Sequence, residues 1–118
     1  MPSPRLVVQD GVTVVTFDAG PHTLDETAVD EVRDAVLAAA LAEPPRVVID
    51  LTEVEFFGSS FIELMFRLWK RLQDRSGRFA LCGASSYCRE VLAVTKLERL
   101  WQTFDTRDEA VRGMNVPQ

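Results

Sequence analysis

The sequence has very few of the residues that build metal centres and disulfide frameworks. Its 118 residues include two cysteines, Cys82 and Cys88, and one histidine, His22. The cysteine spacing fits neither a zinc motif nor a CxxC redox pair, so we expect two reduced thiols with a structural role. A lone histidine beside Gly20 and Pro21 is typical of a turn. We therefore predict no metal site and no cofactor.

Long hydrophobic runs and an excess of basic residues are also missing. No apolar stretch approaches the roughly 20 residues that cross a bilayer, and no signal peptide is visible at the N-terminus. Thirteen Lys and Arg stand against eighteen Asp and Glu, which gives a formal net charge of −5. Such a chain repels a phosphate backbone. We predict a cytoplasmic protein that neither inserts into a membrane nor binds nucleic acid.

Catalytic motifs are absent as well. The sequence contains no GxxxxGK[ST] loop, no GxGxxG after a strand, no HExxH and no GxSxG. Three acids, Asp50, Glu53 and Glu55, follow a buried strand, where α/β folds place their sites. Such acids bind a cation, act as acid and base, or simply form a solvated loop edge. We predict no catalytic residues and keep an enzyme or ligand-binding domain that uses these acids as an alternative.

What the sequence does contain is a regular alternation of strand and helix patterns. Asp10-Gly11 between two β-rich runs is the strongest short hairpin signal, and Thr23 to Glu26 and Thr106 to Glu109 read as capping boxes. The expected elements are strands at 5–9 and 12–17, a helix at 23–42, a strand at 46–51, a loop at 52–60, a helix at 61–76, a strand at 78–82, a helix at 86–94, an edge strand at 100–104 and a short helix from 106. This alternation predicts one α/β domain over residues 1–118, with parallel strand pairs, a core at about 5–112 and frayed termini.

Two adjacent serines lie between a strand and a helix. Ser60 followed by Glu63 fits a capping box, which predicts that Ser60 is the N-cap. Ser59 is then left one position outside the helix with an exposed hydroxyl. A phosphate on Ser59 would face free amides and the positive end of the helix dipole, and it would add about −1.5 to −2 charges. The alternative is that the pair serves only the loop and the cap.

Together these segments resemble the STAS domain, and more narrowly the bacterial anti-sigma factor antagonists. The resemblance rests on Val-Val-Ile-Asp-Leu-Thr-Glu-Val-Glu-Phe-Phe-Gly-Ser-Ser at 47–60, the following helix, Gly-Arg-Phe-Ala-Leu at 77–81, the run at 89–100 and Phe-Asp-Thr-Arg-Asp-Glu-Ala at 104–110. It extends from about Leu6 to Val111. The implied fold is a small α/β domain with a mixed central sheet and helices mainly on one face.

The family resemblance implies a binding switch. The unphosphorylated form of such a protein binds an anti-sigma factor that is itself a serine kinase, and a phosphatase reverses the phosphorylation. The family pattern Asp-Ser-Ser/Thr-Gly, matched residue by residue, puts Ser59 at the acceptor position and Ser60 after it. Gly58 and Phe61 depart from the pattern, because they replace the Asp and the Gly. We predict phosphorylation at Ser59 rather than Ser60.

The helix that follows the serines has an unusually wide apolar arc, with Ile62 and Phe66 on one edge. This edge either packs against neighbouring elements or anchors a partner beside Ser59. The predicted partner-binding residues are Gly58, Ser59, Ser60, Phe61, Ile62 and Phe66. A rival interpretation is a STAS subunit that docks on the cytoplasmic ATPase of an ABC-type transporter, which needs no phosphoserine.

Overall fold

The computed structural model describes residues 3–117 and contains the expected mixed sheet. Its strands lie in the order β1-β2-β4-β6-β7, where β1 and β2 are antiparallel and all other pairs are parallel. The strand bounds are Pro4–Gln9 (β1), Val12–Phe17 (β2), Arg46–Asp50 (β4), Arg78–Cys82 (β6) and Gln102–Phe104 (β7). The predicted α/β fold with parallel pairs is confirmed.

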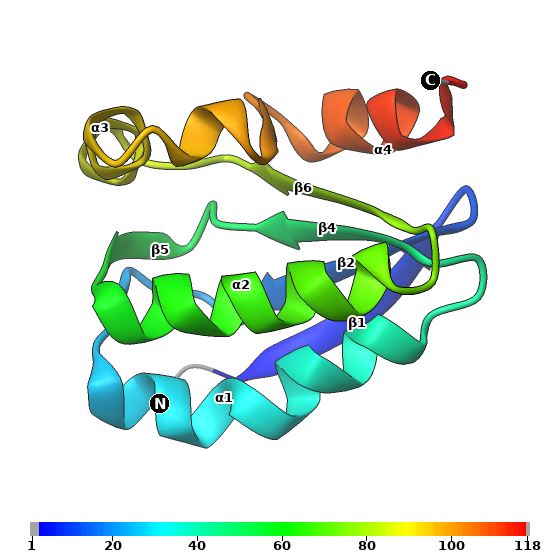
Figure 1. Ribbon diagram of the computed structural model, residues 1–118. Helices are drawn as coiled ribbons and strands as arrows, with labels where there is room; N and C mark the ends of the chain where they lie inside the picture. The colour runs from blue at the N-terminus through cyan, green and yellow to red at the C-terminus, as the bar shows by residue number, and fades with distance from the viewer. Residues whose placement is uncertain (1–2, 118) are drawn as a thin grey trace.

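Helices cover both faces of this sheet unequally (Figure 1). Their bounds are Glu26–Ala38 (α1), Ser59–Gln73 (α2), Ser86–Val94 (α3) and Arg107–Asn115 (α4), with short 3-10 turns at Ala39–Leu41 (η1) and Leu97–Arg99 (η2). The buried side chains of α1, α2 and α3 share the larger core, and those of α4 form a smaller core on the other face. Within residues 3–117, no helix combines the length and hydropathy needed to cross a membrane.

Local signals in the sequence place several elements correctly. Asp10 and Gly11 adopt φ values of 51° and 79°, as a two-residue turn between β1 and β2 requires. The Thr106 hydroxyl accepts a hydrogen bond from the Glu109 amide at 3.2 Å and caps α4. Both cysteines are free and buried. Burial raises the pKa of the Cys82 thiol to about 12 and also raises the pKa of Cys88, so neither is a reactive thiolate at neutral pH.

A second, two-stranded sheet was not expected from the sequence. His22–Leu24 (β3) pairs in parallel with Val54–Phe57 (β5), a segment predicted to be loop. His22, predicted in a turn, therefore lies in a strand, and its Nε2 is 2.9 Å from an Asp18 carboxylate oxygen. Each of these short strands forms by pairing with the other, which is distant in the sequence, so no local pattern predicts them.

The start of α1 also differs from its expected position. Thr23 belongs to β3, and the N-cap is Asp25, whose carboxylate accepts a hydrogen bond from the Ala28 amide at 2.9 Å. Asp and Thr both cap helices well, so the pairing of β3 decides between them. At its other end α1 stops at Ala38 and tightens into η1, short of the predicted limit at Ala42.

Candidate partner-binding site

The site predicted from the sequence lies where β5 ends and α2 begins. The Gly58 amide donates to the Leu24 carbonyl at 3.2 Å, which ties the junction to β3. Gly58 has φ −104° and ψ −169° and is the N-cap of α2, without a side chain to fill that role. Helical geometry starts at Ser59, two positions after the end of β5.

The structure corrects the predicted role of Ser60. This residue is the second in α2 rather than its N-cap, and its hydroxyl makes no capping hydrogen bond. Ser59 is the first helical residue instead of lying one position outside, and it is exposed. Within residues 3–117 neither hydroxyl has a hydrogen-bond partner, so Ser60→Ala would remove no helix cap.

Phe61 does not belong to the accessible surface. Its side chain is only 1% exposed and stacks on Phe57, with the ring centroids 5.2 Å apart. A partner therefore cannot touch Phe61, and its ring does not shield the Ser59 hydroxyl. The prediction that Phe61 is itself a contact residue is wrong, because the third position of α2 faces the core.

Ser59, Ile62 and Phe66 share one face of α2, since they follow each other at intervals of three and four residues. Ile62 is half-buried, whereas Phe66 is 38% exposed. The Phe66 ring rests edge-on against Trp69 and Trp101, with centroids 6.2 and 4.9 Å away. Trp69 and Trp101 were not predicted to belong here. They give the exposed ring a rigid apolar base, so a small apolar surface begins near the accessible serine.

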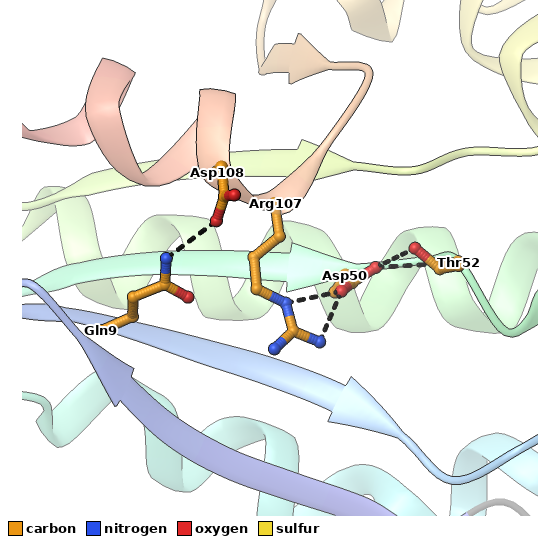
Figure 2. A network of polar contacts seen from close by, with 5 residues as sticks. All are labelled: Gln9, Asp50, Thr52, Arg107 and Asp108. Carbon is orange, nitrogen blue, oxygen red and sulfur yellow. Dashed lines mark hydrogen bonds and ion pairs between the residues drawn. The ribbon is translucent and has the colours of Figure 1, made fainter.

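The three acids of the alternative hypothesis do not all converge, because Asp50 and Glu53 line one pocket together with Arg107 whereas Glu55 does not. Asp50 is 5% exposed and accepts hydrogen bonds from the Thr52 amide and hydroxyl at 3.0 and 2.5 Å. Arg107 donates to the other carboxylate oxygen from Nε and Nη2, at 2.9 and 2.8 Å (Figure 2). The Glu53 carboxylate instead accepts a hydrogen bond from the Gly20 amide at 3.3 Å, and the Glu55 side chain is exposed.

This geometry gives Asp50 a structural role. Burial by itself would raise the pKa of Asp50, but the Thr52 hydrogen bonds and the Arg107 guanidinium outweigh it and lower the pKa below the ordinary value. The carboxylate therefore stays ionised and ties the end of β4 to the start of α4. Among residues 3–117 no group of three or more His, Cys, Asp or Glu side chains is placed to hold a metal ion.

These features define a small α/β domain whose outward elements are a serine at a helix start and an apolar helix face, as in a regulatory protein-binding module. The model of the STAS domain family matches residues 3–110. The chain therefore belongs to the STAS domain family. No curated protein matches it.

Solved structures resemble the chain over nearly its whole length. The anti-sigma-factor antagonist (STAS) domain protein from Planctomyces limnophilus is 45% identical, with a TM-score of 0.89 over 96% of this chain and 98% of that one. An anti-sigma factor antagonist from Mycobacterium paratuberculosis is 25% identical, with a TM-score of 0.85 over 98% and 96%. The Bacillus cell fate determinant SpoIIAA, solved in its phosphorylated form, shares the fold at 21% identity, with a TM-score of 0.66 over 94% and 98%.

The vacant cap at Gly58 leads to a stability prediction. A Cβ built on Gly58 meets nothing within 4 Å, and its φ suits any residue. Gly58→Asp should therefore raise the free energy of unfolding by about 0.5 kcal/mol, through a cap to the first amides of α2 and a favourable charge at the helix start. Urea denaturation measures the change. Gly58→Ala is the control, and an equal gain in both variants would contradict the capping explanation.

Proposed function

We propose that this STAS domain is an anti-sigma factor antagonist that binds a serine-kinase anti-sigma factor through the face formed by Ser59, Ile62 and Phe66. Phosphorylation of Ser59 by that kinase weakens the complex, and a phosphatase restores it. The observation that carries the proposal is the exposed, unbonded hydroxyl of Ser59 at the first position of α2, next to an apolar helix face. The likeness to a 45% identical antagonist supports it.

The helix start suits a phosphate chemically. A group on Ser59 would lie beside amides that have no partner within α2 and near the positive end of its dipole. The first turn of α2 contains no acidic residue, and the nearest acid on the same helix face, Glu63, is one turn further along and exposed. The fold would therefore tolerate the modification while its surface changes strongly.

A phosphate would weaken binding of the partner through its charge and through the cost of removing water from it. It adds about −1.5 to −2 charges to an interface whose other contacts, Ile62 and Phe66, must lose water to bind. Burying that charge without a matching cation costs more than the apolar contacts return. The result is a switch that acts on affinity and leaves the fold unchanged.

Substitutions at the two serines test this proposal. We expect Ser59→Asp to bind the proposed kinase partner several-fold more weakly than the wild type, and Ser59→Ala to bind like the wild type. Ser60→Asp is the matched control, because Ser60 points about 100° away around the helix and should change affinity little. Titration calorimetry with the purified kinase and a non-hydrolysable ATP analogue measures the affinities.

The site of modification is decided by mass spectrometry after incubation with the kinase and ATP. Phosphate on Ser59 alone is the expected result. Phosphate only on Ser60, or none with a kinase that is active on another substrate, would overturn the switch. A pull-down from native lysate that recovers a transport ATPase and no kinase would favour the transporter subunit instead.

A further inference from the structure

Strand β1 presents a long and unusually apolar free edge. It pairs with β2 on one side, and within residues 3–117 no strand pairs with its other side. Three consecutive residues, Leu6, Val7 and Val8, are exposed, and Val8 is 71% accessible. The opposite edge strand, β7, has three residues, whereas β1 has six. Proteins prevent the pairing of an exposed edge strand with another chain by keeping the strand short or by placing charged side chains on it. The centre of β1 has neither feature.

The hairpin determines which backbone groups are free. Gln9 and Val12 flank the two-residue turn, so they form a hydrogen-bonded pair, and the alternation along β1 then directs Val7 and Arg5 toward β2 as well. The amides and carbonyls of Leu6 and Val8 consequently point outward. A second antiparallel strand can pair with this edge, because Leu6 and Val8 each offer a free backbone amide and carbonyl and are separated by one residue.

We propose that β1 pairs antiparallel with β1 of a second copy of this chain, about a two-fold axis at Val7. In this register Leu6 of one copy lies opposite Val8 of the other, and each of the two pairs exchanges two backbone hydrogen bonds. The product is one continuous sheet of two five-stranded halves. The pairing is isologous, as closed two-fold dimers are.

Side chains match in this register on both faces of the sheet. On one face the two Leu6–Val8 pairs bring four exposed aliphatic side chains together. On the other face Val7 meets its own copy in a non-hydrogen-bonded pair, the type in which opposite Cα atoms come within about 4.5 Å. Cross-strand apolar pairs of this kind stabilise sheets.

The charges are also complementary. Arg5 of one copy lies opposite Gln9 of the other, and the Gln9 side-chain amide already donates to the Asp108 carboxylate at 3.0 Å (Figure 2). Arg5 makes no ion pair within residues 3–117, and Asp108 is exposed on the same face. The guanidinium therefore arrives beside a carboxylate, twice in each dimer. A partner strand of different sequence would not obtain these contacts from β1 alone.

A strand pairing of this length buries a small area, so the dimer is weak and depends on concentration. Sedimentation velocity from about 10 µM to about 1 mM should show a reversible monomer–dimer equilibrium, a range that covers weak affinities. Val8→Lys places a charge at the centre of the edge and should raise the dissociation constant by about tenfold or more. The matched control is Val94→Lys, which makes the same change at a residue 75% exposed in α3.

A charge exchange tests the register. Arg5→Asp and Asp108→Arg should each weaken the dimer, and the double variant should restore it, because the two charges meet only between copies. A chain that stays monomeric up to about 1 mM would overturn the proposal. So would a dimer equally sensitive to Val8→Lys and Val94→Lys, or one in which the double variant is no better than the singles. None of these outcomes bears on the Ser59 switch, since α2 is unchanged.

Discussion

Arg107→Met is expected to lower the free energy of unfolding at pH 7 by about 3 kcal/mol. The reason is that the Asp50 carboxylate, which is buried in the folded chain, loses its counter-ion. Methionine keeps the apolar stem of arginine, so the change isolates the guanidinium. The expected loss is at the lower end for a broken buried ion pair, because two Thr52 hydrogen bonds remain on Asp50. Urea denaturation followed by circular dichroism measures it.

The chain offers a matched control on its surface. Arg89 and Asp105 approach to 2.9 Å, much like Arg107 and Asp50, but both side chains are exposed. Arg89→Met should therefore cost less than about 1 kcal/mol, since water solvates the remaining carboxylate. Equal losses in the two variants would show that burial does not set the strength of the Asp50 pair.

The same pair makes stability depend on pH. The pKa of Asp50 is lowered in the folded chain, so its contribution is fully present above the unfolded value of about 3.9 and is lost as the pH falls through the folded pKa. Asp50→Asn removes this titration. We expect the stability gap between the wild type and Asp50→Asn to be constant near neutral pH and to narrow below about pH 4. A gap that widens in acid would contradict the assigned direction.

Phe61→Ala is expected to lower the free energy of unfolding by about 3–5 kcal/mol, the usual cost of removing a buried aromatic ring. The ring is 1% exposed and stacked on Phe57, so its loss leaves a cavity at the start of α2. Thermal and urea denaturation of the variant measure the loss.

Phe66→Ala separates packing from binding. Phe66 is the same residue type in the same helix, but it is partly exposed. Phe66→Ala should lower the free energy of unfolding by about 1–2 kcal/mol, because less area is buried at this residue. It should also weaken binding of the proposed kinase. Phe61→Ala should leave the affinity of the folded fraction for that kinase unchanged. Weaker binding in Phe61→Ala alone would move the partner surface away from Phe66.

Signals that depend on neighbours in the sequence were sufficient for much of the fold. Asp10-Gly11 specifies its turn by positive φ, the β-branched run at 46–51 indicates the buried strand β4, and Thr106 caps the helix that starts beside it. The same kind of signal placed the serines of the candidate site close to the start of the helix that follows, although both belong to α2 rather than preceding it. It also separated the five strands of the main sheet from the helices, whereas their order in the sheet was not predicted and β3 and β5 were missed.

Decisions between competing local signals required the tertiary structure. Thr23 and Asp25 are both good caps, and Asp25 prevails because Thr23 is taken into β3 by pairing with β5. Ser60 loses its expected cap because α2 starts two residues earlier, after Gly58 is bonded to Leu24. Phe61 faces inward because it lies three and four residues before the buried Leu64 and Met65, on the same face of α2.

The ion pair between Asp50 and Arg107 shows most clearly what could not be predicted from the sequence. An acid at the end of a buried apolar strand is expected to have a partner, because an unpaired buried charge is costly. The partner of Asp50, however, is Arg107, which lies 57 residues further along the chain. Sequence periodicity therefore determined most of the strands and helices and the short segment in which the exposed serine lies. Only the packed structure decided which side chains meet, because contacts between distant segments depend on the three-dimensional arrangement of the whole sheet.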